Sequence, residues 1–331
     1  MSNSAGVDFV TLGESMVLVQ PLRDGPLAHE SLLTRAMGGA ESNVAIALSR
    51  LGLKARWVSR LGRDPFGDII RSTLAGEGVD VAFVARDESA STAVYFREIK
   101  GLGDPGVYYY RRGSAASLLS AEDVRPDWMH DARHLHVTGI TPALSSGARE
   151  ATFAAMRLGR ELGLSISFDP NLRRKLWDEA TARATLLEMV PLCDIFLPGV
   201  DEAEFLCGQS SPEGCAEYFL SLGPSLVVLK RGERGATVWT SELSLTEPAH
   251  RMPRVVDSVG AGDAFDAGFL SVLLEQDSVQ EAWPQPQVLK RALWRANLLG
   301  ALATQIRGDW EGLPTLQEVR RIEAGQAEVT R

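Results

Sequence analysis

A glycine-rich segment, residues 257–265, places one carboxylate where an apolar helix is expected to begin. The start of a helix exposes unpaired N–H groups and a positive dipole end, which together attract phosphate. Gly260 and Gly262 allow the backbone to approach closely, and Asp263 could accept the proton of an attacking hydroxyl. An anion hole formed by Gly260, Ala261 and Gly262 beside a base is what phosphoryl transfer to an alcohol requires. Taken alone, the same residues could form an ordinary helix start, because Asp is favoured there.

Four other segments place polar residues in predicted turns. Residues 38–43 (Gly-Gly-Ala-Glu-Ser-Asn) precede a predicted helix, and an amide there could both donate to and accept from sugar hydroxyls. Residues 168–177 follow a predicted strand, where the loops of parallel α/β sheets bind ligands. A charged turn at 229–236 links two strand-like runs, and another turn at 307–312 follows the predicted helix 289–306. As bare sequence, each is also compatible with a simple connection.

Residues 108–112 read Tyr-Tyr-Tyr-Arg-Arg within a segment that alternates like a strand. In a strand, residues 109 and 111 share one face. The composition favours a cross-strand contact with a solvated basic end. An arginine can also hold a carboxylate through two hydrogen bonds, and a tyrosine can hydrogen-bond a keto or hydroxyl oxygen, so both interpretations stay open.

The composition is that of a large acidic protein. The chain has 331 residues, 45% of them hydrophobic, and a formal net charge of −9, which predicts a sizeable core and argues against a nucleic-acid partner. Its three cysteines, at 193, 207 and 215, form no CxxC pair, so reduced and mostly buried thiols are expected. The N-terminus lacks a leader pattern and no long apolar stretch occurs, which predicts a cytoplasmic protein without a membrane partner.

Short apolar runs alternate with longer helical patterns along most of the chain. Strands are predicted at 7–12, 55–59, 134–139, 164–168, 195–197 and 226–230, and helices at 40–51, 66–76, 146–162, 179–189 and 202–207. This alternation predicts an α/β fold, with a doubly wound, mostly parallel sheet and helices on both faces. Residues 276–287 are predicted to form a surface loop, and the residues after 325 a frayed tail.

Two segments break the alternation. Residues 16–37 and 91–112 alternate like strands with no helix inside either of them. They predict antiparallel strands that form a small separate sheet, inserted at about residues 15–37 and 91–113 of a single domain spanning 1–331.

Residues 257–265 and 38–43 closely resemble the two signatures of the ribokinase-like (PfkB) carbohydrate kinases. Two further family motifs, D-x-N-x-R-x-x-L-W at 169–177 and K-x-G-x-x-G at 230–235, occur in the family order, so the resemblance covers about residues 8–315. It implies a ribokinase-like fold in which the small sheet is a lid over the sugar site and often a dimer interface, here giving a homo-oligomer. It also implies ATP and Mg²⁺ as cofactors, with K⁺ as a candidate monovalent cation.

The resemblance also assigns roles to the matching residues. Asp263 would be the base, Gly260, Ala261 and Gly262 would supply the anion hole, and Arg173 would bridge the acceptor and the transferring phosphate. Gly39 and Asn43 would line the acceptor pocket. The nucleotide side would comprise Asn171, Arg173, Lys230, Gly232, Gly235 and Asn297 together with the anion hole.

One branch of the family, the 2-keto-3-deoxygluconate (KDG) kinases, has a similar Tyr-Tyr-Arg strand, a similar segment 136–144 and a similar Arg-Gly-Asp turn at 307–309. This branch implies ATP-dependent phosphorylation of a sugar acid at its 6-hydroxyl. The residues that would contact the sugar acid are Tyr95, Tyr109, Arg111 and Asp309, beside Gly39, Asn43, Arg173 and Asp263.

One motif departs from the family. Many members carry N-x-x-E after a strand, with a glutamate that reaches Mg²⁺ through water. Here Gly199 replaces the asparagine and Glu202 is kept, so the resemblance implies an indirect metal contact that lacks one supporting side chain.

Several alternatives share the catalytic turn: a fructokinase, a ribokinase, a 5-dehydro-2-deoxygluconokinase, or a non-catalytic sugar-acid sensor. The chain has no Walker motif, no G-x-G-x-x-G after the first strand and no H-R-D triplet. P-loop kinases, classical dinucleotide dehydrogenases and protein kinases are therefore disfavoured.

Overall fold

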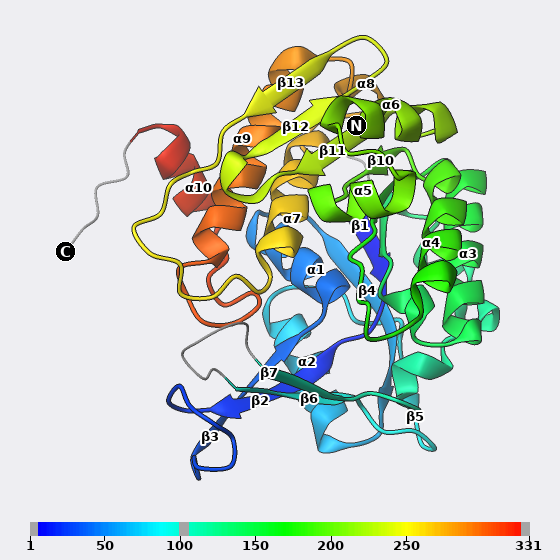
Figure 1. Ribbon diagram of the computed structural model, residues 1–331. Helices are drawn as coiled ribbons and strands as arrows, with labels where there is room; N and C mark the ends of the chain where they lie inside the picture. The colour runs from blue at the N-terminus through cyan, green and yellow to red at the C-terminus, as the bar shows by residue number, and fades with distance from the viewer. Residues whose placement is uncertain (1–5, 99–105, 326–331) are drawn as a thin grey trace.

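A computed structural model describes residues 6–98 and 106–325 (Figure 1). Its main sheet has nine strands: β1 (Val7–Leu12), β4 (Ala55–Gly62), β5 (Val84–Asp87), β8 (Ala132–Thr138), β9 (Ser165–Asp169), β10 (Ile195–Phe196), β11 (Leu226–Lys230), β12 (Ala236–Trp239) and β13 (Ser244–Glu247). The strand order is β13-β12-β11-β10-β9-β8-β1-β4-β5. The strands from β11 to β5 run parallel, and β12 and β13 add an antiparallel hairpin at one edge.

Helices cover both faces of this sheet (Figure 1). One layer consists of α1 (Ala40–Arg50), α2 (Pro65–Gly76), α7 (Ala261–Leu274), α8 (Val279–Ala282), α9 (Pro286–Ala303) and α10 (Leu316–Glu323). The other consists of α3 (Ser146–Glu161), α4 (Glu179–Met189), α5 (Val200–Cys207) and α6 (Pro212–Leu222). Along β1, Phe9 packs into the first layer and Val10 into the second, as the two-residue period of a strand requires. The predicted doubly wound fold is confirmed.

The small sheet is separate, as predicted, but its strands are not all antiparallel. It contains β2 (Met16–Pro21), β3 (Leu33–Gly38), β6 (Val94–Glu98) and β7 (Gly106–Tyr110), in the order β3-β2-β6-β7. The outer pairs are antiparallel, whereas β2 and β6 pair in parallel. The chain leaves this sheet after β3 and returns through α1, β4, α2 and β5, a crossover long enough to bring β6 back in the direction of β2.

Other local predictions need correction. The segment 276–287 contains a short helix, α8, which is capped by Ser278, and the first residues of α9, rather than only a loop. Strand β5 and helices α6 and α10 were not predicted. The predicted tail after residue 325, and the part of the insert at 99–105, lie outside the described residues. None of the helices in the described part of the chain could cross a membrane, and Cys193, Cys207 and Cys215 are free thiols.

The strand order reverses at β1, and this reversal positions the site. The chain runs from β1 to β4 and β5 on one side, and from β8 through β9 and β10 to β11 on the other. In open α/β sheets, ligands bind at such a switch point, outside the carboxyl ends of the strands.

Candidate active site

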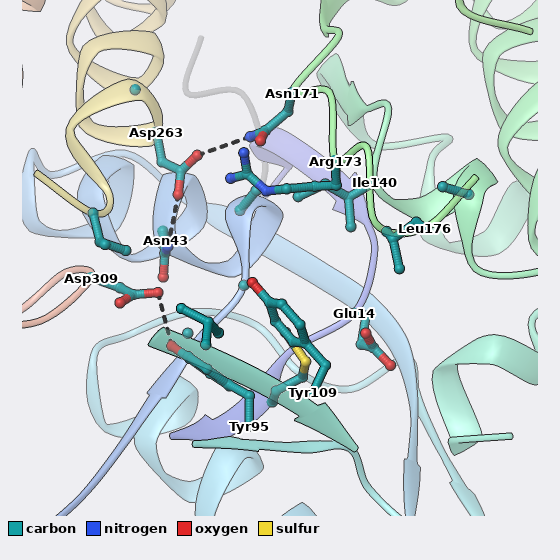
Figure 2. Close-up of a pocket in the computed structure, with 18 of the residues that line it drawn as sticks. Glu14, Asn43, Tyr95, Tyr109, Ile140, Asn171, Arg173, Leu176, Asp263 and Asp309 are labelled. Atoms are coloured by element: carbon teal, nitrogen blue, oxygen red, sulfur yellow. Dashed lines mark hydrogen bonds between the residues drawn. The ribbon is translucent and has the colours of Figure 1, made fainter. Parts of the chain in front are cut away.

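A cavity of about 1060 Å³ opens at the carboxyl ends of the central strands and is also lined by the small sheet (Figure 2). This volume can hold two small substrates side by side. Most of the predicted site residues line it: Gly39, Asn43, Tyr95, Tyr109, Arg111, Asn171, Arg173, Glu202, Lys230, Gly260, Gly262, Asp263 and Asp309.

Asp263 lies in the first turn of α7 and is held from two other segments. Its Oδ2 accepts a hydrogen bond from Asn43 Nδ2 at 2.7 Å, and its Oδ1 accepts a longer one from Asn171 Nδ2 at 3.4 Å (Figure 2). Burial raises the pKa of Asp263, while the hydrogen bond from Asn43 and the charges of Arg173 and Lys230 oppose that rise. The result is a buried carboxylate, fixed in direction, that faces the cavity and can accept a proton.

The loop before α7 matches the predicted anion hole in part. Gly260 caps the helix with φ of 76°, and its carbonyl accepts the first helical hydrogen bond, from Ala264. The N–H groups of the first turn therefore precede the hydrogen-bonded part of the helix. Gly260 and Gly262 line the cavity, whereas the Ala261 N–H lies 3.4 Å from the Ser258 carbonyl oxygen.

Replacing Gly260 by alanine is expected to lower turnover by about 10²-fold, the cost of displacing reacting groups by roughly 1 Å. A Cβ at this position would overlap the carbonyl oxygen of Asp309, and φ is positive, so the loop must move. Gly163→Ala is the matched control, because Gly163 has φ of 77° and open space around it. Steady-state kinetics should show normal turnover in the control; equal losses in both variants would contradict the argument.

The small sheet contributes stacked tyrosines and a buried carboxyl contact. Tyr95 donates to Asp309 Oδ2 at 3.2 Å, and the Tyr109 ring stacks on Tyr95 with centroids 5.8 Å apart. Burial raises the pKa of Asp309 to about 7, although the charge of Arg97 opposes the rise. Asp309 can therefore exist in both protonation states near neutral pH, as a donor or as an acceptor.

Arg111 lies just past the end of β7, and not on the strand itself as predicted. Its Nη2 forms an ion pair of 2.5 Å with Glu14 Oε2, and Glu14 Oε1 accepts from Ser114 Oγ at 2.6 Å. The buried Nε of Arg111 has no hydrogen-bond partner among the described residues. Glu14 lines the cavity and was missed at the sequence level, because nothing in the sequence pairs it with Arg111.

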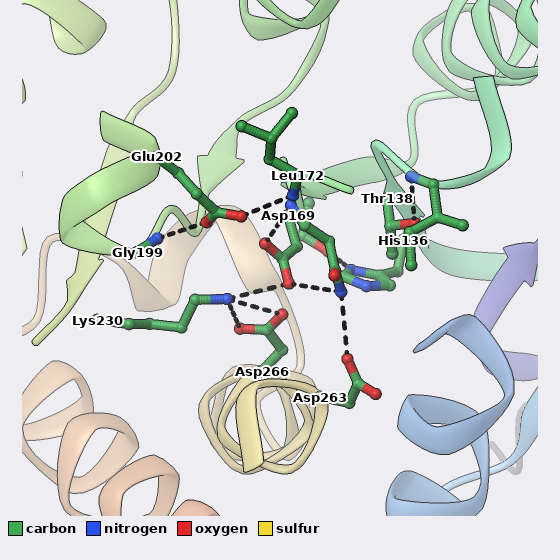
Figure 3. A network of polar contacts seen from close by, with 12 residues as sticks. His136, Thr138, Asp169, Leu172, Gly199, Glu202, Lys230, Asp263 and Asp266 are labelled. Atoms are coloured by element: carbon green, nitrogen blue, oxygen red, sulfur yellow. Dashed lines mark hydrogen bonds and ion pairs between the residues drawn. The ribbon is translucent and has the colours of Figure 1, made fainter. Parts of the chain in front are cut away.

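Lys230 is held by two carboxylates that were not assigned a role. Its Nζ lies 3.0 Å from Asp169 Oδ2 and 3.2 Å from Asp266 Oδ1 (Figure 3). Burial alone would lower the pKa of Lys230, but these carboxylates hold it above its usual value. Asp266 stands three residues after Asp263, so helical spacing could have placed both near the same site.

Three residues predicted for the nucleotide side, Gly232, Gly235 and Asn297, do not line this cavity. Asn297 Nδ2 donates to the Glu247 carbonyl oxygen at 3.1 Å, and a Cβ on Gly235 would overlap that same oxygen. Asn297 and Gly235 therefore meet at the end of β13, and the predicted contacts of all three residues with the nucleotide stay predictions.

Glu202 is well anchored despite the glycine at 199. Its Oε2 accepts from the Gly199 N–H at 2.8 Å and its Oε1 from the Leu172 N–H at 2.7 Å (Figure 3). Burial raises the pKa of Glu202. Both oxygens already have backbone donors, so an indirect contact with a metal fits this carboxylate better than direct ligation. In residues 6–98 and 106–325, no three His, Cys, Asp or Glu side chains are grouped to hold a metal.

The chain is similar to known carbohydrate kinases, as its motifs and cavity predict. The model of the pfkB family of carbohydrate kinases matches residues 8–316. A 2-dehydro-3-deoxygluconokinase from Bacillus subtilis (strain 168) is 41% identical over 326 residues, which cover 98% of this chain and 97% of the relative.

Two solved structures have the same fold. One is described as a ribokinase II from E. coli in complex with ATP and Mg²⁺; it is 28% identical with a TM-score of 0.86, covering 96% of this chain and 99% of the other. The second is a fructokinase double mutant from Vibrio cholerae O395 with fructose, ADP and potassium bound; it is 30% identical with a TM-score of 0.84, over 96% and 99% of the two chains.

Proposed function

Because this chain belongs to the pfkB family of carbohydrate kinases, we propose that it uses ATP to phosphorylate 2-keto-3-deoxygluconate at the 6-hydroxyl. The observation that carries this proposal is the buried Asp263 at the start of α7, fixed by Asn43 and Asn171. It faces a cavity whose opposite wall offers Tyr95, Tyr109 and Arg111 to a sugar acid. The whole chain would form one kinase domain, and the small sheet would be its lid.

The reaction follows from the positions of these residues. Asp263 takes the proton of the sugar's primary hydroxyl as that oxygen attacks the γ-phosphorus of ATP, and the bond from this phosphorus to the β,γ-bridging oxygen breaks to release ADP. The N–H groups of the loop 260–262 and the cation of Arg173 stabilise the charge on the phosphoryl oxygens. The lid excludes water, so that the phosphoryl group passes to the sugar.

Mg²⁺ would be held mainly by the nucleotide phosphates, whose charge it neutralises, with Glu202 placed for a contact through water. Lys230 would contact the phosphates from its site between Asp169 and Asp266. We also propose that K⁺ supports activity. Exchange of K⁺ for Na⁺ at constant ionic strength should lower turnover, and equal rates would exclude that role.

The substrate is tested by ADP release with Mg-ATP and a panel of five sugars: KDG, its galacto epimer, fructose, ribose and 5-dehydro-2-deoxygluconate. Strong turnover on KDG supports the proposal. Turnover only on a neutral sugar would overturn the roles of Tyr109 and Arg111. Binding of sugar acids without turnover would favour the alternative of a non-catalytic sugar-acid sensor.

Replacing Arg111 by alanine is expected to raise KM for a sugar acid by about 10-fold or more, since a charge-assisted hydrogen bond contributes roughly 1.5–3 kcal/mol. Fructose, which lacks the carboxylate, should be affected much less, and kcat should change little. Arg63→Ala is the matched control, because Arg63 also pairs with a glutamate, Glu88, but is exposed and does not line the cavity. If KM for both sugars rises equally, Arg111 does not recognise the carboxylate.

The outer part of the lid would pair with a second copy of the chain. Leu22, Leu33 and Tyr110 are 51%, 47% and 68% exposed there. Leu33 and Tyr110 lie on the two edge strands of this sheet and Leu22 follows β2, and exposed apolar side chains of this size favour an interface. Light scattering after size-exclusion chromatography should give a dimer, and Leu33→Glu with Tyr110→Glu should convert it to a monomer.

A further inference from the structure

A buried ion pair joins the small sheet to the loop that precedes α7. Arg97 of β6 places its Nη1 2.7 Å from Asp257 Oδ2, and the two side chains are only 1% and 3% exposed. The same guanidinium donates from Nε and Nη2 to Gln20 Oε1 of β2, at 3.1 and 2.9 Å. Arg97 is therefore fixed within the small sheet and reaches out of it to one carboxylate.

The Asp257 carboxylate accepts hydrogen bonds from two backbone segments. Its Oδ1 accepts from the Val259 N–H at 3.2 Å, in the loop that leads to Gly260. Its Oδ2 accepts from the Gly308 N–H at 3.1 Å, in the turn after α9 that carries Asp309. The carboxylate thus stands where the small sheet, the anion-hole loop and this turn meet.

The contacts around this junction are tight. Gly260 packs so closely against the Asp309 backbone that a Cβ would overlap its carbonyl oxygen. Asp309 in turn accepts the hydroxyl of Tyr95, two residues before Arg97 on β6. A change in the position of β6 would therefore be passed to Gly260 by two routes, through Asp309 and through Asp257.

We propose that Arg97 and Asp257 are positioning residues that fix the sugar contacts of the lid relative to the anion-hole loop; this inference rests on the proposed kinase function. The sugar is held from the lid, the phosphate from residues 260–262, and the ion pair spans the boundary between them. Transfer requires the reacting atoms to lie about 3–3.5 Å apart, and a shift of about 1 Å can cost about 10²-fold in rate. A buried pair suits this purpose because neither charge can leave the other without a large penalty.

The test uses the double variant Arg97→Met/Asp257→Asn, which leaves neither charge buried alone and should therefore fold. We expect its kcat to fall by about 10- to 100-fold with KM for ATP nearly unchanged. ATP hydrolysis without transfer should take a larger share of turnover, because a displaced lid admits water. Hydrogen exchange, measured without substrates, should rise together in residues 94–98, 257–260 and 307–309.

Arg295→Lys, compared with Arg97→Lys, controls for the general effect of disturbing a buried arginine. Arg295 is fully buried and pairs with Glu275 and Glu323 at 2.6 and 2.8 Å, and neither partner belongs to the small sheet. Arg295→Lys should lower the melting temperature but leave kcat and the fraction of ATP hydrolysed without transfer unchanged. Arg97→Lys should alter both kcat and that fraction.

Two results would overturn the inference: a double variant with normal kcat and normal coupling of hydrolysis to transfer, or lost activity with exchange unchanged in the three segments. If the wild-type protein transfers phosphate to none of the five sugars, the proposed function fails instead. The exchange measurement would still decide whether the pair fixes the lid to the loop, because it uses no substrate.

Discussion

Replacement of Asp263 by asparagine is expected to reduce kcat by at least about 10²-fold, the usual scale for loss of a positioned base. The amide has nearly the shape of the carboxylate and can still accept from Asn43, so the fold and KM for ATP should change little. Steady-state kinetics and a melting curve, measured on the same preparation, separate loss of the base from loss of structure.

Asp68→Asn is the matched control, because Asp68 also lies in the first turn of a helix, α2, but is 73% exposed and pairs with Arg86. Its kcat should be normal. Near-normal turnover of Asp263→Asn would show that proton removal is not needed, or that another group performs it.

The pH dependence provides a second test of Asp263. A base acts as the carboxylate, so kcat/KM should fall as the pH drops through the pKa of Asp263, which burial places above the ordinary aspartate value of about 3.9. Asp309, whose pKa is raised to about 7, titrates in the same cavity. Asp309→Asn should therefore keep the lower limb of the profile, and Asp263→Asn should abolish it.

Local sequence signals predicted the elements that form the main sheet. The predicted bounds of β1, β11 and α4 agree with the structure, because both strands are short and mostly apolar and α4 begins directly after an aspartate, Asp178, that caps it. The parallel pairing of β2 with β6 could not be predicted in this way. It depends on the path of the 72 residues between Pro21 and Val94, which a two-residue alternation does not report.

In the candidate site, too, local motifs could be predicted and long-range contacts could not. The motifs predicted that Asn43, Asn171 and Asp263 belong together, and the structure places them in contact. The partners of the charged residues, such as Glu14 for Arg111 and Asp257 for Arg97, were not predicted. A charge in a sequence does not specify which opposite charge, some eighty or more residues away, will neutralise it once both are buried. The glycines at 232 and 235 do not line the cavity, and a turn motif does not define its distance from it, so their contact with the nucleotide stays a prediction.

Replacing Arg173 by methionine is expected to lower kcat by about 10²- to 10³-fold, the range for loss of one group that stabilises transition-state charge. Arg173 follows β9, lines the cavity and lies beside Asp263 in Figure 2. It should act on the transferring phosphoryl group, so KM for the sugar should change less than kcat.

The same substitution should also move the pH profile of kcat/KM. This shift shows whether the cation of Arg173 acts directly on Asp263 or only adds positive charge to the cavity. The cation of Arg173 opposes the raised pKa of Asp263, so its removal should raise that pKa further and move the acid limb to higher pH. Arg174→Met is the matched control, because Arg174 also lines the cavity, but its guanidinium lies 5.0 Å from the Phe205 ring centre and pairs with Glu179. Equal effects of both substitutions would mean that the cavity needs only positive charge, whereas loss and shift in Arg173→Met alone would place the required cation beside the base.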